Sequence, residues 1–259
     1  MIIMDVVYVA WRELLKFFRA RVRLLVTVIQ PLIWLGLMGN MMQGLTQNPF
    51  IERLLGTTSY LAFMTPGIIL MTVLFGGVFS GLSIVWDRRI GYLEKLLAAP
   101  ISRAAIPLGK MVASAIQGGF QGLLILLIAL GLGVRFSTGL AGVLFALLVA
   151  MTFSLILSGF SLTLASRIKS QETLMALVNF FTMPLMFTSN ALFPREAMPA
   201  WLSAIAQINL VTHAVTPIRQ VLLFGWDWSS MWVSLVVIGG LALLMAFLAG
   251  QSFLRATAE

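Results

Sequence analysis

The feature that most constrains this chain is a series of six uncharged apolar stretches, each long enough to cross a lipid bilayer. A helix needs about 20 apolar residues to cross the ~30 Å hydrocarbon core, and a charge at mid-span costs roughly 2.5–3.5 kcal/mol on insertion scales. The stretches lie near residues 24–42, 60–86, 111–134, 139–166, 173–194 and 231–254. They predict six transmembrane helices.

The composition agrees with a protein that faces lipid. The chain is 60% hydrophobic and 10% charged, whereas soluble domains carry about 25% charged residues. We therefore expect an all-α integral membrane protein. Because no long polar linker interrupts it, residues 24–259 are predicted to form one transmembrane domain, preceded by a separate helix over residues 1–23.

A seventh uncharged stretch, 197–218, differs from the others. Pro199 and Pro217 interrupt it, and it carries Asn209 and His213. We expect two short helices that dip partway into the outer leaflet, sheltered by protein. A true seventh span is the alternative.

The distribution of Lys and Arg predicts the orientation. With six spans and an inner N-terminus, 13 of the 17 Lys and Arg residues fall on the inner side and four on the outer side. Inner loops are enriched in these residues, so both termini should be cytoplasmic in a plasma (inner) membrane. Trp226, Trp228 and Trp232 stand where an outer aromatic belt would anchor the last span.

The segment 1–23 has two faces at helical spacing. The apolar face consists of Val7, Trp11, Leu14, Phe18 and Val22. The basic face consists of Arg12, Lys16, Arg19 and Arg23. This pattern predicts an amphipathic helix that lies at the inner interface, with its cations at anionic lipid headgroups. The simpler alternative is an orientation signal.

Several kinds of chemistry are excluded or disfavoured. Cysteine is absent and His213 is the only histidine, so thiolate chemistry and multi-His metal sites are excluded. The only Gly-Lys pair, Gly109-Lys110, precedes Met111 instead of the hydroxyl residue that a P-loop needs. We therefore expect no cofactor, metal or ATP bound by this chain, no enzymatic activity of its own and no nucleic-acid partner.

Polar residues within the spans indicate little about a substrate. No carboxylate falls inside a predicted span, which argues against an ion-coupled carrier. Gln117 and Gln121 stand one turn apart, and we expect them to hydrogen-bond each other or a neighbouring helix. His213 has no carboxylate close in sequence, so a capping or packing role is expected for it.

The long inner loop between the second and third spans predicts a short helix. Leu93, Leu96 and Leu97 form an apolar stripe beside Glu94 and Lys95. Pro100 ends this helix. Its apolar face could dock into a groove of a partner protein or lie on lipid, and the residues leave both open.

Three blocks of residues resemble the type-2 ABC transporter permeases, which include drug, lipo-oligosaccharide and polysaccharide exporters. The first block comprises Gly91, Leu93, Glu94, Lys95, Leu96, Leu97, Pro100 and Arg103. The second and third comprise Pro194, Pro199 and Trp201, then Asn209 and His213 leading to Arg219. Leu210 replaces the family's usual proline, and Thr216 stands where an acidic residue is common.

The resemblance implies a role for each block. The first would be a coupling helix held in the groove of a separate ABC ATPase, which binds ATP and Mg²⁺. The second and third would form the outer re-entrant segment, and residues 1–23 the connecting helix. Such permeases work as dimers and move substrates by alternating access; a homodimer is expected here, with membrane lipid around it.

The resemblance therefore implies export of an amphipathic drug, a lipid-like molecule or a lipid-linked glycan. The absence of charges at mid-span suits all three classes. Two other functions remain open: an ATP-independent channel or carrier, and a membrane scaffold protein.

Overall fold

A computed structural model describes residues 2–43, 55–57, 59–168 and 170–256, and in these ranges the chain is helical without a strand. The helices before the middle of the chain are α1 (Ile2–Arg19), α2 (Arg21–Gln43), α4 (Tyr60–Arg89), α5 (Tyr92–Ala98) and α6 (Ala105–Gly131). They are followed by α7 (Gly139–Arg167), α8 (Gln171–Phe187), η2 (Arg195–Ala197), α9 (Ala200–Ile208), α10 (Leu210–Arg219), the π-helix η3 (Gln220–Phe224) and α11 (Trp228–Ala256).

Four of the described helices, α4, α6, α7 and α11, are long and apolar enough to cross a membrane. The pair Ile2–Arg19 and Leu24–Gly39, bent by 68°, makes a fifth candidate if it is counted as one span. The prediction of an all-helical membrane protein is thereby confirmed. The predicted span 173–194 is shorter in the structure, because α8 ends at Phe187 after 17 residues and so covers about 26 Å.

Close approach of helix backbones holds the centre of the bundle together. Gly77 and Gly81 of α4 face α7, where an added Cβ at Gly81 would collide with Ser161 and one at Gly77 would lie 2.9 Å from Leu157 Cβ. The Ser161 hydroxyl donates to the Val78 carbonyl oxygen. Small residues thus let α4 and α7 pack at short range, as they commonly do between membrane helices.

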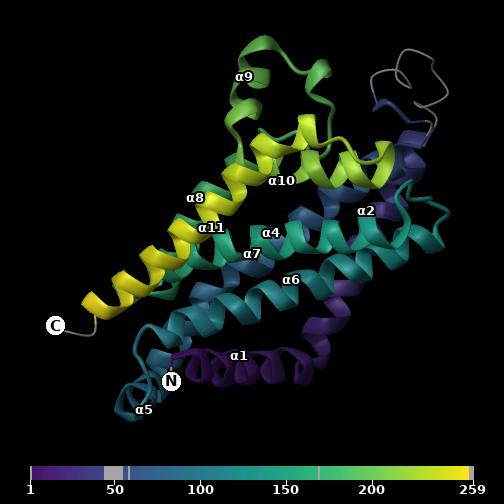
Figure 1. Cartoon of the computed structure of the whole chain (residues 1–259). Coiled ribbons are helices and arrows are strands. Elements are labelled where there is room, and N and C mark those ends of the chain that lie inside the picture. Colours follow the sequence, from purple (N-terminus) through teal and green to yellow (C-terminus); the bar gives the residue numbers. More distant parts are fainter. Residues whose placement is uncertain (1, 44–54, 58, 169, 257–259) are drawn as a thin grey trace.

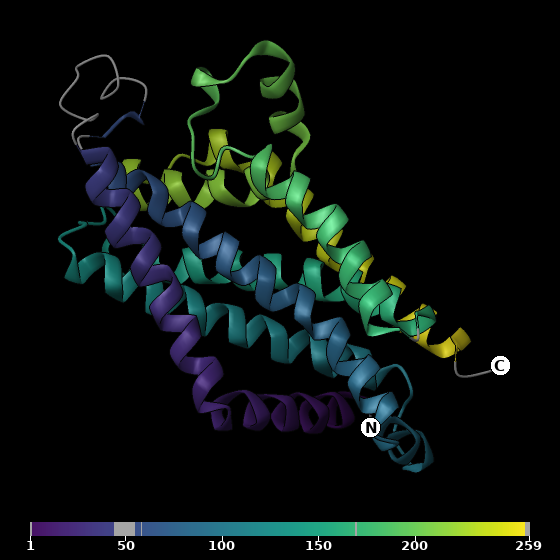
Figure 2. The same ribbon diagram turned by 180° about the vertical axis from the view of Figure 1, so that it is seen from behind.

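The two ends of the bundle differ in what they carry (Figures 1 and 2). The start of α1, the helix α5 and the end of α11 lie at one end, which we call the α5 end. The helices α9 and α10 lie at the other end, which we call the α9 end. Both ends of the described chain therefore emerge at the α5 end.

The two faces expected of residues 1–23 are placed differently: the apolar face lies outside the bundle, whereas the basic face meets the bundle in part. Val7, Trp11 and Phe18 are exposed, whereas Val9 and Phe17 pack inward. A Cβ at Gly109 of α6 would lie 2.6 Å from Val9 Cβ, so α1 presses closely on α6. The expected basic face is divided: the side chains of Arg12 and Lys16 reach into the bundle because carboxylates meet them there.

The stretch 197–218 forms two short helices, as the sequence predicted. The helices α9 and α10 have nine and ten residues and are separated at Asn209. Neither is long enough to span a bilayer, so this stretch does not form a continuous seventh span.

Candidate functional site

The loop at the α5 end owes its shape to a glycine and a proline. Gly91 has φ 68°, a left-handed conformation that favours glycine, and it turns the chain from α4 into α5. Ala99 is extended, as residues before proline usually are, and Pro100 prevents further helix. The result is a seven-residue helix at the end of the bundle (Figure 1).

The apolar stripe of α5 packs against the helical bundle itself. Leu93 is buried in a cluster with Val85, Ile106 and Leu162, and Leu96 and Leu97 pack against this cluster. The bundle therefore buries Leu93 and covers part of Leu96 and Leu97. The exposed side chains of the loop are Glu94, Lys95, Ala98, Pro100 and Arg103, so its outer surface is mainly polar.

Two contacts attach the α5 loop to α1. The guanidinium carbon of Arg12 lies 3.6 Å from the centre of the Tyr92 ring, within the range of a cation–π interaction. The backbone N–H of Ser102 donates to the Asp5 carboxylate at 3.1 Å. The helix α1 thus contacts the loop both at the start of α5 and after its end.

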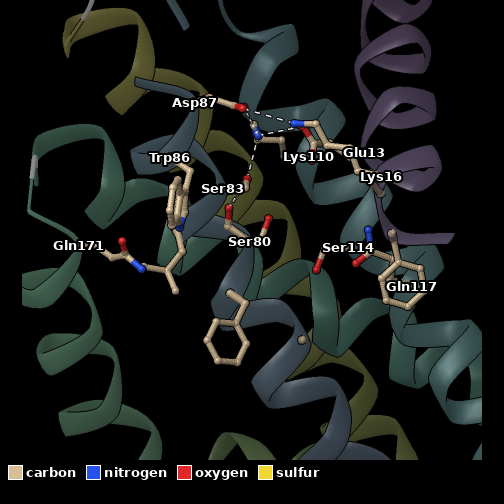
Figure 3. Close-up of a pocket in the computed structure, with 15 residues that line it drawn as sticks. Glu13, Lys16, Ser80, Ser83, Trp86, Asp87, Lys110, Ser114, Gln117 and Gln171 are labelled. Carbon is tan, nitrogen blue, oxygen red and sulfur yellow. Dashed lines mark hydrogen bonds and ion pairs between the residues drawn. The ribbon is translucent and has the colours of Figure 1, made fainter. Parts of the chain in front are cut away.

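Beside these contacts, charged side chains from three helices meet in a cluster around Lys110 (Figure 3). The Lys110 ammonium on α6 donates to Asp87 on α4 at 2.7 Å and to Glu13 on α1 at 3.0 Å. It also donates to the Ser83 hydroxyl at 2.8 Å. Its side chain is only 1% exposed.

Two further cations complete the same cluster. Arg12 lies 3.2 Å from Asp87 and 3.1 Å from Glu13, and Lys16 lies 3.3 Å from Asp87 and 3.5 Å from Glu13. Burying a single charge is costly unless it is paired and hydrogen-bonded. Each of the five charges has a partner here, so the arrangement requires α1, α4 and α6 to keep their relative positions.

A cavity of about 540 Å³ adjoins this cluster. Its lining comes mainly from α1, α4 and α6 and mixes aromatic with polar side chains (Figure 3). The aromatic members are Phe17, Phe79 and Trp86, and the polar members include Ser80, Ser114 and Gln117. Such a mixture can receive a molecule that has both an apolar and a polar part.

At the α9 end, side chains satisfy the carbonyl oxygens beyond the broken end of α8. Asn209 caps α10 by accepting from the Val211 N–H at 2.8 Å. Its amide nitrogen donates to the Leu185 carbonyl at 2.9 Å and to the Thr188 hydroxyl at 2.8 Å. Asn209 therefore links the start of α10 to the end of α8.

Arg219 also donates hydrogen bonds to backbone carbonyl oxygens at this end, and it does so from a buried position. Its guanidinium donates to the carbonyl oxygens of Phe63 at 3.3 Å, Asn190 at 2.9 Å and Ala191 at 3.1 Å. It also lies 3.8 Å from the centre of the Phe63 ring. No carboxylate among the described residues lies within salt-bridge distance of it, so backbone dipoles, the ring and the more distant charge of Glu196 supply its stabilisation.

The other residues singled out in the outer segment have simpler roles. Pro194 and Pro199 precede η2 and α9, where their fixed φ favours a helix start. Trp201 is exposed. His213 Nδ1 lies 3.1 Å from the Ser234 hydroxyl on α11, and burial lowers the pKa of His213; a neutral, packed histidine agrees with the expectation.

The sequence model of the ABC-2 type transporter family matches residues 4–223. The chain belongs to the ABC-2 type transporter family. Family membership implies an ABC ATPase subunit as partner of this permease, and the resemblance inferred from the three sequence blocks is confirmed.

Several proteins similar to this permease are named as transport permeases. It is 32% identical over 221 residues to the putative transport permease ycf38 of Porphyra purpurea, covering 85% of this chain and 74% of that one. It is 26% identical over 212 residues to the daunorubicin resistance ABC transporter permease protein DrrB1 of Streptomyces coeruleorubidus, covering 82% and 72%. It is 30% identical over 184 residues to the probable multidrug ABC transporter permease YbhR of Escherichia coli (strain K12), covering 69% and 49%.

Sequence reasoning missed the charge cluster of the permease. Glu13, Asp87 and Lys110 are far apart in the chain; Asp87 and Lys110 adjoin the ends of apolar stretches and Glu13 lies in the amphipathic segment 1–23, where charges are ordinarily solvated. One signal was present: Lys110 lies on the same helical face as Ser114 and Gly118, which is a face of small residues suited to close packing. A lysine on such a face is expected to need a carboxylate partner.

We expect Asp87→Leu to lower the free energy of unfolding of the permease by about 3 kcal/mol, because it leaves buried Lys110 with Glu13 as its one carboxylate. The double variant Asp87→Leu with Lys110→Met should recover most of that loss. Heating the purified variants and measuring the folded fraction by fluorescence-detected size exclusion gives the thermal midpoint of each variant. A lower midpoint reports the loss of stability, and a restored midpoint reports its recovery. Equal midpoints for wild type and Asp87→Leu would contradict the assigned cluster.

We expect Arg219→Lys to destabilise the permease strongly although it keeps the charge, because an ammonium lacks the planar fork that reaches three separate carbonyls. Arg195→Lys is the matched control, since the guanidinium of Arg195 donates a single hydrogen bond among the described residues, to the Ser203 hydroxyl at 3.1 Å. In the same heating assay, the thermal midpoint should fall by several degrees for Arg219→Lys and by almost nothing for Arg195→Lys. Similar midpoints for the two variants would exclude the clamping role.

Proposed function

We propose that this permease is the membrane subunit of an ATP-driven exporter, with the α5 loop as the element that receives force from a separate ATPase. The observation that carries the proposal is the division of α5 into two sides. Its leucines are anchored in the bundle, whereas Glu94, Lys95 and Pro100 are exposed. A helix that packs on the bundle with one side and is exposed on the other can transmit a movement of a bound partner to the bundle.

The proposed topology has six crossings, made by α2, α4, α6, α7, α8 and α11. The helix α8 is short, and the hydrogen-bonded segment after it would complete its crossing, since irregular backbone in a membrane must be sheltered by protein. The excess of Lys and Arg on the loops of the α5 end supports a cytoplasmic location for this end and for both termini. The exposed Trp11 and Phe18 of α1 would then contact lipid of the inner leaflet of the plasma membrane.

The contacts of α5 suggest how a movement would spread. Leu93 connects α5 to the bundle, and the Arg12–Tyr92 contact connects it to α1. Arg12 also belongs to the Lys110 cluster, so a displacement of α5 reaches α1, α4 and α6 together. ATP and Mg²⁺ would be bound by the partner ATPase, whose closure would move these helices and open the path outward by alternating access.

Two copies of the permease would enclose the pathway. Phe180 and Phe187 on α8 and Leu25 and Ile29 on α2 are large exposed apolar side chains, and α2 and α8 flank α4 on the same side of the bundle (Figure 2). A two-fold contact along this side would cover them. The proposed cargo is an amphipathic drug, a lipid-like molecule or a lipid-linked glycan.

Replacing the exposed side chains of the α5 loop should uncouple ATP hydrolysis from export. In vesicles that contain the permease and its ATPase, we expect Glu94→Ala with Lys95→Ala to reduce ATP-dependent transport at least tenfold and to leave the thermal midpoint unchanged. Glu172→Ala is the control, because it removes an exposed carboxylate at the start of α8. Normal transport by the double variant would refute the coupling role, and transport without ATP would indicate a channel or carrier instead.

The chain has no cysteine, so single introduced cysteines can report the proposed dimer. We expect oxidation to cross-link Phe180→Cys on α8 across the two-fold contact. Leu243→Cys on α11 is the matched control, since Leu243 is equally exposed but belongs to a different face. Electrophoresis without reductant measures the dimer; a strictly monomeric Phe180→Cys protein would refute this arrangement.

A further inference from the structure

The buried guanidinium of Arg219 has one nitrogen whose hydrogen-bonding capacity is unused. Its Nε donates to the Phe63 carbonyl, and its Nη2 donates to the carbonyls of Asn190 and Ala191. Its Nη1 donates to no acceptor among the described residues, although the side chain is only 8% exposed. Because a buried donor without an acceptor is destabilising, the surroundings of Nη1 are the place to look for a ligand.

Arg219 lines a cavity of about 720 Å³ at the α9 end of the bundle. The walls of this cavity come from residues 55 and 56, from α4, from the segment between α8 and η2, from η2 itself, and from α10 with the π-helix η3. It shares no lining residue with the cavity beside Lys110. The two cavities are therefore separate, and they lie at opposite ends of the bundle.

Two further residues present unused donors to the same cavity. Arg195 on η2 donates through Nε to the Ser203 hydroxyl, whereas its two Nη groups make no hydrogen bond within the described ranges. The Thr212 hydroxyl on α10 accepts from the Asn190 N–H at 3.2 Å, and its own proton has no acceptor in the part of the chain that the structure covers. Thr212 is only 7% exposed. The cavity is therefore rich in donors.

The charges of the lining leave a positive excess. The lining contains Arg195, Arg219 and one carboxylate, that of Glu196. Glu196 is exposed on η2, and no salt bridge of the described residues joins it to either arginine. A buried cation is most stable beside an opposite charge that also accepts its hydrogen bonds. A ligand with a single negative charge would bring the cavity to neutrality.

We propose that this cavity binds a phosphate group, carried by the headgroup of an anionic lipid or present as free phosphate. Arg219 Nη1, the Arg195 guanidinium and the Thr212 hydroxyl donate to its oxygens. The bound phosphate compensates the charge of Arg219 and joins η2 to α10. The site is remote from the α5 loop, and its occupation does not depend on the proposed export.

The free donors favour a tetrahedral oxyanion over a carboxylate. A carboxylate pairs best with two parallel N–H groups of one guanidinium. At Arg219, backbone carbonyls already occupy Nε and Nη2, so this fork is closed. The remaining donors belong to residues on two different elements, η2 and α10. A phosphate group offers several strongly accepting oxygens that point in different directions, and it can accept from all of these donors together.

Thermal stabilisation by defined anions tests the site in the full-length permease. The protein is purified in a maltoside detergent without phosphate buffer, and the midpoint is measured by the heating assay at constant ionic strength. The probes are sodium phosphate, sodium acetate, and micelles that contain phosphatidylglycerol or phosphatidylcholine. Because a ligand that binds only the folded state raises its stability, we expect a rise of several degrees with phosphate or phosphatidylglycerol. Acetate and phosphatidylcholine should cause almost none.

The two phosphate probes distinguish the source of the ligand. A rise with sodium phosphate identifies a site that is open to the free anion. A rise with phosphatidylglycerol alone identifies a lipid headgroup site, in which the glycerol and acyl parts contribute to binding. Both results support the proposal, provided that the variants below change the affinity as expected.

Three variants assign the stabilisation to this cavity and leave Arg219 in place. Arg195→Gln should weaken the affinity for the effective probe about tenfold, because it removes a charge-assisted hydrogen bond. Glu196→Gln should strengthen it severalfold, because it removes the carboxylate that repels the anion. Arg135→Gln is the matched control, since Arg135 is an exposed arginine of the loop between α6 and α7 and does not line the cavity. The dependence of the midpoint on probe concentration gives each affinity.

Three outcomes would overturn the proposal. The first is a midpoint that neither phosphate probe raises. The second is the same affinity in wild type and Arg195→Gln, which would reveal a general effect of the salt or lipid on stability. The third is an equal rise with acetate. A merely structural Arg195 would lower the midpoint of the anion-free variant and leave the affinity unchanged.

Discussion

The arrangement of this permease depends on one buried ammonium group. Lys110 enters the bundle on α6 and is stable there because Asp87 from α4 and Glu13 from α1 meet it at hydrogen-bond distance. Removing α1 or α4 would take away one of the two carboxylates that pair with Lys110, in a place with little water. The same requirement orients α1, which turns Arg12 and Lys16 toward the bundle instead of toward lipid. It also places Arg12 against Tyr92, so that the α5 loop belongs to the same unit.

At the α9 end, the arrangement depends on supplying hydrogen-bond donors to backbone carbonyl oxygens and not on pairing opposite charges. Where α8 stops at Phe187, carbonyl oxygens lose their helical donors, and in a membrane they must find others within the protein. Asn209 and Arg219 supply them. The two ends of the bundle therefore use cations in opposite ways: Lys110 compensates carboxylates, whereas Arg219 compensates peptide dipoles. Both solutions hold helices that are distant in sequence in one relative position.

Much of the fold could be predicted because it follows from local pattern. Hydrocarbon-length uncharged runs predicted the helices α4, α6, α7 and α11, and Pro100 predicted the end of α5. The pairing of Lys110 with Glu13 and Asp87 could not be predicted, because Asp87 and Lys110 adjoin the ends of apolar runs and Glu13 lies in an amphipathic segment, where solvation is the ordinary expectation. The hydrogen-bonding of Gln121 was predicted wrongly for a related reason: spacing on α6 brings Gln117 near it, but the partner it faces is Gly76 of α4, which offers no side chain.

The sequence by itself determined that this protein is helical, lies in a membrane and belongs to the ABC-2 permeases, because hydropathy, breakers and short motifs act over a few turns of one helix. Only the tertiary structure decided which face each helix turns inward. It packed the leucines of α5 against the bundle, with Leu93 buried, and left Glu94 and Lys95 outside, and it set a cavity between α1, α4 and α6. The physical reason is that the environment of a side chain depends on the helices that pack around it. Residues far apart in the chain determine that packing jointly.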